Sequence, residues 1–130
     1  MTRLLLDTQV ALWWLAASPR LSTASRELMA SSPCVVSAAS IWEVDLKHRL
    51  GKLPVPARRF RDEMQAAGAA ILSVSDTHVL TAVKLPRDHR DPFDRLLLSV
   101  AVAEHLVLLT ADAALVDLAR SVPQLPVRSV

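Results

Sequence analysis

The sequence has little glycine and little cysteine, and each shortage narrows what the protein can be. Gly51 and Gly68 are the only glycines among 130 residues, which excludes the glycine-rich loops that hold nucleotide phosphates. The single cysteine, Cys34, cannot form an internal disulfide, as expected of a protein in a reducing compartment. It has no histidine nearby in the sequence, so a thiol nucleophile is not expected either.

Long apolar runs are also missing, although 52% of the residues are hydrophobic. No run reaches the roughly 18 residues that a membrane-spanning helix needs. Asp7 interrupts the apolar start of the chain after three leucines, so a secretory signal peptide is not expected. We therefore expect a cytoplasmic protein that does not enter the membrane.

Neither sign of charge dominates, since 15 lysines and arginines face 13 acidic residues. The basic residues nevertheless gather in two stretches: Lys47, Arg49, Lys52, Arg58, Arg59 and Arg61 in the first, and Arg87, Arg90 and Arg95 in the second. Such clusters can bind phosphates, or they can form an ordinary solvated helix face.

Short apolar runs alternate with segments of helical periodicity along the whole chain. The runs predict strands at 3–6, 34–37, 69–74 and 106–110, with a short last strand in 125–130. Helices are predicted at 8–18, 22–32, 38–50, 57–68, 76–85, 92–105 and 111–121. Continuous apolar strands alternating with helices indicate an α/β fold with a parallel sheet covered on both faces. We expect one domain over residues 1–130.

Two aspartates follow predicted strands, and each has a simple structural explanation. Asp7 comes directly after strand 3–6, and Asp112 follows strand 106–110. Aspartate is a favourable N-cap residue, so each could merely start the next helix. Ligands of parallel sheets, however, bind beyond the carboxyl ends of the strands, which is where both residues fall.

Two further acids lie on apolar helical faces. Glu43 shares a face with Ala39, Leu46 and Leu50, where a carboxylate is costly to bury unless it is paired or bound to a cation. An ordinary salt bridge would also explain it.

Asp94 lies three residues after Asp91, with Pro92 between them at the predicted first helical position. A carboxylate there can reach back toward the N-cap amide and favours the helix dipole. Capping does not explain why its face is otherwise apolar, with Leu97, Leu98 and Ala101.

Taken together, these four acids predict a site at one end of the sheet. Neighbouring carboxylates raise one another's pKa, and a divalent cation relieves that repulsion. A carboxylate site without a Cys/His ligand set suits Mg²⁺, with Mn²⁺ as an alternative, rather than Zn²⁺. Metal-dependent hydrolysis of a phosphodiester follows as the hypothesis.

Other residue types give weaker indications. The four histidines show no metal-ligand spacing and are expected at the surface or at helix ends, with His89 the one nearest a substrate. The three tryptophans, Trp13, Trp14 and Trp42, are expected in the core or an interface rather than as base-stacking platforms.

Four segments of the chain resemble one known family. They are LLLDTQVALWWL, VVSAASIWEVDLKHRLGKL, LPRDHRDPFDRLLLSVAVAE and LLTAD. They resemble PIN-domain ribonucleases and, more narrowly, the VapC-type toxins of type II toxin–antitoxin systems. The resemblance spans about residues 3–113; SAASIWE and HRDPFDRLL carry most of its specificity.

The resemblance implies a PIN-like three-layer α/β/α sandwich and a Mg²⁺-dependent endoribonuclease. The family's acidic set falls on Asp7, Glu43, Asp94 and Asp112, with the metal held through Asp7 and Asp94. Thr8 and Thr110 match small polar positions beside the acids. An antitoxin of the VapB type, an RNA substrate and a homodimer are the implied partners.

Two positions depart from the family, and two other readings stay open. Gln9 stands where many relatives have histidine, and Asp45 adds an acid where they often have a small or apolar residue. A catalytically silent PIN-like module that binds RNA or protein would retain the fold without the metal. A phosphoaspartate receiver would need an acidic pair by the first strand and a lysine after a late strand, and neither is evident.

Overall fold

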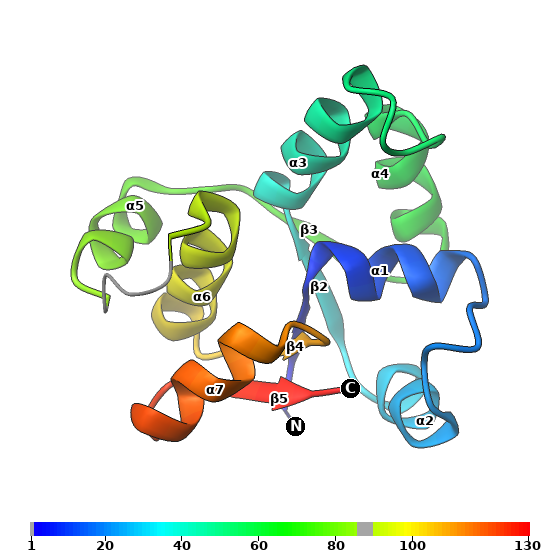
Figure 1. Ribbon diagram of the computed structural model, residues 1–130. Coiled ribbons are helices and arrows are strands. Elements are labelled where there is room, and N and C mark those ends of the chain that lie inside the picture. Colours follow the sequence, from blue (N-terminus) through cyan, green and yellow to red (C-terminus); the bar gives the residue numbers. More distant parts are fainter. Residues whose placement is uncertain (1, 86–89) are drawn as a thin grey trace.

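A parallel sheet with helices on both faces forms the fold in the computed structural model, which describes residues 2–85 and 90–130 (Figure 1). The described strands are ordered β3-β2-β1-β4-β5, and each neighbouring pair runs parallel. They are β1 (Leu4–Leu6), β2 (Cys34–Ser37), β3 (Ala70–Leu72), β4 (Val107–Thr110) and β5 (Val127–Ser129). The predicted α/β/α sandwich with a mainly parallel sheet is confirmed.

Helices fill each connection between the strands. They are α1 (Thr8–Leu15), α2 (Thr23–Ser31), α3 (Ala38–Arg49), α4 (Ala57–Ala66), α5 (Asp76–Val83), α6 (Pro92–Glu104) and α7 (Ala113–Ser121). No helix in residues 2–85 and 90–130 is long and apolar enough to cross a membrane.

The side chains of the central strand, β1, alternate between two separate hydrophobic cores. Leu4 and Leu6 of β1 belong to the core shared with Val10 of α1 and Phe60 of α4. Leu5 points to the opposite face, into the core formed largely by α6 and α7. Successive strand side chains point to opposite faces, so a strand covered by helices on both sides must be apolar throughout.

Helix α3 begins directly after β2 and lies between the two helical layers. It packs against α4 on one side and α6 on the other. The Ser37 hydroxyl caps its start by accepting a hydrogen bond from the Ala39 amide at 3.1 Å. Gly51 follows its end at φ +73, the left-handed position that glycine adopts without strain. This placement brings Glu43 to Thr8 at the start of α1.

The start of α6 also agrees with the sequence. Asp91 is its N-cap and accepts hydrogen bonds from the amides of Phe93 at 2.9 Å and Asp94 at 3.2 Å. Pro92 occupies the first turn, where its missing amide hydrogen costs nothing. The cap therefore fixes where α6 begins, and with it the position of Asp94 on the buried face of the helix.

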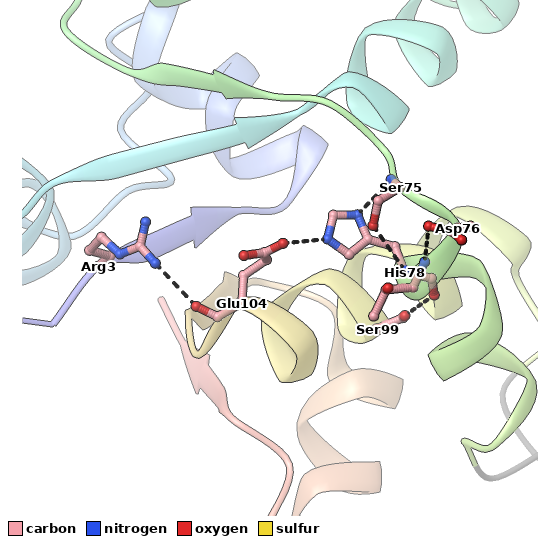
Figure 2. A network of polar contacts seen from close by, with 7 residues as sticks. Arg3, Ser75, Asp76, His78, Ser99 and Glu104 are labelled. Atoms are coloured by element: carbon pink, nitrogen blue, oxygen red, sulfur yellow. Dashed lines mark hydrogen bonds and ion pairs between the residues drawn. The ribbon is translucent and has the colours of Figure 1, made fainter.

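One of the histidines expected at the surface or at helix ends lies at a helix end but is buried. His78 in the first turn of α5 is 1% exposed. Its Nδ1 accepts the Ser75 amide hydrogen at 3.1 Å, so the ring proton lies on Nε2, 2.8 Å from a Glu104 carboxylate oxygen of α6 (Figure 2). The Ser99 hydroxyl donates to the His78 carbonyl from the same helix. His78 is thus a structural link between α5 and α6, while His89 lies outside the described residues.

Candidate functional site

A pocket of about 340 Å³ at the carboxyl end of the central strands contains all four predicted acids. Its lining comprises Asp7, Gln9, Trp13, Arg20, Glu43, Lys47, Asp91, Asp94, Ala111 and Asp112. These residues come from four helices or their N-caps (α1, α3, α6 and α7) and from the connections beside them. The topology therefore brings together acids that are more than 100 positions apart in the sequence.

Asp7 is a buried acid of the pocket whose pKa is raised. It directly follows β1 and is 7% exposed. Burial raises the pKa of its carboxyl group, and the charges of Glu43 and Asp112 raise it further, against the lowering effect of hydrogen bonds. Asp7 occupies the N-cap position of α1 but makes no side-chain capping hydrogen bond. The capping explanation is therefore wrong for this residue.

Thr110 connects Asp7 to the other side of the pocket. Its hydroxyl donates to an Asp7 carboxylate oxygen at 2.5 Å and accepts the Asp112 amide hydrogen at 3.0 Å. Thr110 is fully buried at the end of β4. Since β1 and β4 are hydrogen-bonded neighbours, the sheet itself sets the distance between Asp7 and this hydroxyl.

Glu43 has partners on both carboxylate oxygens. One oxygen accepts the Thr8 hydroxyl at 2.7 Å, and the other lies 2.7 Å from Lys47 Nζ. The salt bridge that was the alternative explanation of Glu43 is thus present, and Glu43 is also 8% exposed and lines the pocket. Its predicted face is only partly buried, because Leu50 is 69% exposed.

Lys47 keeps its positive charge in this setting. Burial alone would lower the pKa of its amine, but the hydrogen bond and charge of Glu43, with the charges of Asp91 and Asp7, raise it above the usual value. Lys47 is the member of the predicted 47–61 basic cluster that lines the pocket.

Asp94 and Asp112 reach the pocket in different ways. Asp94 is 8% exposed on the buried face of α6, alongside Leu97, Leu98 and Ala101 as predicted. Asp112 does cap its helix, accepting hydrogen bonds from the first amides of α7. Capping and pocket lining therefore coincide in Asp112.

Most of the other predicted basic residues face elsewhere. Arg49 pairs with Asp45, Arg59 with Glu63 and Arg61 with Asp62 on exposed surfaces. Arg90 and Arg95 line a separate groove beside α5, and Arg87 lies outside the described residues. The additional acid Asp45 is thus part of a surface ion pair, away from the pocket.

Sequence reasoning missed two residues of the pocket wall, Trp13 and Arg20. Trp13 is half-buried on α1, and Arg20 is exposed in the connection between α1 and α2. Trp14 also packs against the core, whereas Trp42 is 59% exposed and contacts Phe93 edge to face. No local pattern distinguishes Arg20 from any other surface arginine.

The donor set fits a magnesium ion that keeps most of its water. Within the described residues, no three acidic, histidine or cysteine side chains are gathered closely enough to form a complete protein ligand set. Mg²⁺ commonly retains several waters and binds through one or two carboxylates. Burial is the main cause of the raised pKa of Asp7, and the charges of Glu43 and Asp112 add to it.

The sequence profile of the PIN domain matches residues 4–121, and the chain belongs to that family. It is 31% identical over 119 residues to Ribonuclease VapC22 of Mycobacterium tuberculosis, covering 88% of this chain and 91% of that protein. A 47-residue segment is 45% identical to Ribonuclease VapC16 of the same organism, covering 34% of this chain and 33% of that protein. The resemblance to VapC-type ribonucleases seen in the sequence is thereby confirmed.

Solved structures with the same fold include toxin–antitoxin assemblies. VapBC2 from Rickettsia felis, bound to a DNA fragment from its promoter, has a TM-score of 0.70 at 16% identity over 98% of each chain. VapBC-1 from nontypeable Haemophilus influenzae has a TM-score of 0.68 at 16% identity, again over 98% of each chain. At this level of identity the similarity establishes the fold.

Proposed function

We propose that this chain is a Mg²⁺-dependent endoribonuclease, the toxin of a type II toxin–antitoxin pair, with Asp7, Glu43, Asp94 and Asp112 as its site residues. The observation that carries the proposal is their convergence in one pocket, with a buried Asp7 whose pKa is raised by burial and by neighbouring carboxylates. Similarity to a ribonuclease over most of the chain supports RNA as the substrate class.

Asp7 and Asp94 are the proposed metal ligands, since both are buried and line the same pocket. When bound, Mg²⁺ or Mn²⁺ supplies an activated water and offsets the charge that develops on the phosphate. The Thr110 hydroxyl orients Asp7 for this role, as groups behind metal ligands commonly do.

Glu43 and Asp112 are proposed to act on the attacking water. Thr8 and Lys47 hold the Glu43 carboxylate in place, and the raised pKa of Lys47 keeps its cation beside that carboxylate at neutral pH. An ionised carboxylate accepts hydrogen bonds but does not donate them. Glu43 can therefore align a water molecule without forming a hydrogen bond to the phosphate. Asp112 lines the pocket just after the carboxyl end of β4, the strand beside β1, and its capping bonds to α7 fix its position.

RNA cleavage with Mg²⁺ tests the assignment directly. The wild type, Asp7→Asn and Asp94→Asn would be purified without partner and compared on total RNA, with Asp45→Asn as the control because Asp45 pairs with Arg49 outside the pocket. We expect cleavage by wild type and control and its loss in the two pocket variants. Equal activity in all four proteins would refute the proposal.

Metal titration separates the enzyme from a catalytically silent PIN-like module. Mg²⁺ binding to the folded state should raise the melting temperature, as any ligand of the native state does. The increase should be lost in Asp7→Asn and kept in Asp45→Asn. A silent module would show no dependence on Asp7.

A VapB-type antitoxin is the proposed protein partner. The related Rickettsia and Haemophilus structures are VapBC assemblies. An arginine or lysine of such a partner would be attracted into a pocket lined by five carboxylates and two cations among the described residues. Co-expression with the adjacent gene product should yield a complex that no longer cleaves RNA; free toxin activity in that complex would contradict this.

Homodimerisation and a cytoplasmic location complete the proposal. Val79, Leu80 and Val83 of α5 are between 51% and 62% exposed, and such an apolar surface is typical of an interface. Leu80→Glu should convert a dimer to a monomer in light scattering, whereas a wild-type monomer would contradict the assignment. An RNA substrate and an unpaired Cys34 thiol are consistent with the cytoplasm.

A further inference from the structure

Arg20 forms part of the acidic pocket wall without belonging to the acidic site. It lies in the connection between α1 and α2 and lines the pocket together with Trp13. The Arg20 guanidinium carbon lies 5.8 Å from the centre of the Trp13 ring, within the range of a cation–π contact. The aromatic face thus limits the directions that the arginine side chain can take.

The charge of Arg20 is available, unlike that of the other cation in the pocket. Lys47 is committed to Glu43 at 2.7 Å. The Arg20 guanidinium makes no hydrogen bond or salt bridge with any residue in 2–85 or 90–130, and the bond recorded for Arg20 runs from its backbone amide to Ser18. An exposed arginine beside several carboxylates that pairs with none of them is free to bind an anion from solution.

The connection that carries Arg20 is well fixed. The Ser18 amide donates to the Trp13 carbonyl at 2.9 Å, and Leu21 is buried in the core at 3% exposure. Arg26 of α2 donates to the carbonyls of Ser18 and Leu21 on either side of Arg20. A guanidinium held on such a loop loses less conformational entropy when it binds.

We propose that Arg20, supported by Trp13, binds a backbone phosphate of the RNA strand at the entrance to the acidic pocket. The inference rests on the proposed ribonuclease function and extends it to a substrate-positioning residue. Five carboxylates line the pocket, and they repel the polyanionic RNA strand unless positive charge balances their own. The guanidinium fork matches two phosphate oxygens and stays ionised at any physiological pH.

A phosphate contact and a base contact predict different behaviour. A phosphate contact weakens binding uniformly across sequences and contributes a fixed share of the salt dependence. An arginine that reads a guanine edge would instead affect only substrates with guanine at one position. The experiment therefore measures sequence dependence and salt dependence together.

The test compares Arg20→Gln and Arg20→Lys with wild type, and Arg49→Gln serves as the control arginine on an exposed ion pair outside the pocket. We expect Arg20→Gln to lower kcat/KM for short single-stranded RNAs about 10-fold or more, since hydrogen bonds to charged groups are the stronger kind. The slope of log(kcat/KM) against log[salt] should become shallower by about 0.7, the share of one phosphate contact on single-stranded RNA. Arg20→Lys should restore part of the rate, and Arg49→Gln none of these changes.

Binding is measured separately from cleavage in an Asp94→Asn background. Fluorescence anisotropy of a labelled single-stranded RNA should show weaker binding when Arg20→Gln is added. Wild-type affinity and salt slope in Arg20→Gln, or a loss confined to guanine-containing RNAs, would overturn the inference. If wild type itself cleaves no RNA while Arg20 still governs anisotropy, the ribonuclease proposal fails and the phosphate contact stands.

Discussion

The ammonium group of Lys47 lies 2.7 Å from a carboxylate oxygen of Glu43, one helical turn earlier in α3. The side chain of Glu43 is 10% exposed and that of Lys47 is 43% exposed, so the pair is neither a surface bridge nor a fully buried one. Removing the lysine leaves a largely buried carboxylate whose remaining hydrogen-bond partner among the described residues is the Thr8 hydroxyl.

Lys47→Met should therefore destabilise the metal-free protein. We expect a loss of about 1–2 kcal/mol in the free energy of unfolding, between the values for exposed pairs and for broken buried pairs. Urea denaturation in EDTA measures it. Arg49→Met removes the matched i,i+4 partner of Asp45, which is more exposed, and should cost less than about 0.5 kcal/mol. Equal effects would show that burial of Glu43 does not matter.

Asp7→Asn should stabilise the metal-free protein at neutral pH. The folded-state pKa of Asp7 is raised by burial, so ionising it costs folded-state stability. This cost is absent below the ordinary aspartate pKa of about 4 and becomes complete above the folded-state pKa. The variant should therefore be more stable than the wild type at pH 7, and the gain should vanish as the pH falls to about 4.

Thermal melts of both proteins across this pH range in EDTA provide the measurement. Asp117→Asn is a suitable control, because Asp117 lies on the surface beside Arg120. A wild type that is more stable than Asp7→Asn at neutral pH without metal would contradict the raised pKa.

Thr110→Val should alter the pH profile of RNA cleavage. The Thr110 hydroxyl lowers the Asp7 pKa by hydrogen bonding, so its removal should raise that pKa further. The acidic limb of kcat/KM against pH should then move to higher pH, with a loss of about 10–100-fold in rate, as for other groups that orient metal ligands. Thr110→Ser keeps the donor and should restore the wild-type limb; an unshifted limb in Thr110→Val would contradict the role.

His78→Ala should destabilise the fold without a direct effect on the pocket. It removes the Nδ1 acceptor of the Ser75 amide and the Nε2 donor to Glu104 (Figure 2), and it leaves a cavity between α5 and α6. We expect a loss of about 2–4 kcal/mol by chemical denaturation, as for other large core truncations. Thr77→Ala, an exposed neighbour in the same turn, should stay near the wild type.

The sequence predicts the fold well because both of its main signals are local. Apolar runs identify β1, β2 and β4, and alternation with helices is sufficient to predict a parallel sheet. The end of a helix is harder to predict where no glycine follows it. Helix α1 ends at Leu15, three residues before the predicted end, because Ala17 takes a left-handed conformation at φ 49 where glycine would be expected. The strand predicted at 69–74 spans only Ala70–Leu72, because its pairing with the neighbouring strand β2 ends at Leu72 opposite Ser37.

The pocket was predictable in part for a related reason. Asp7 and Asp112 are marked by the strands before them, and Glu43 and Asp94 by the apolar faces around them. Arg20 lies in a loop and reaches the pocket through tertiary packing, which leaves no periodic trace. Within the 47–61 basic cluster, Lys47 lines the pocket, whereas Arg49, Arg59 and Arg61 pair with acids on their own helices.

The order of the strands has a consequence for the timing of activity during synthesis. β1 lies in the middle of the sheet, yet its neighbour β4 begins at Val107. A ribosome must therefore translate more than four-fifths of the 130 residues before Asp7 can meet Thr110. Until then β1 lacks one of its two neighbours, and the proposed cleavage site is incomplete. The proposed site can therefore form only after the segment that carries β4 has left the ribosome and paired with β1.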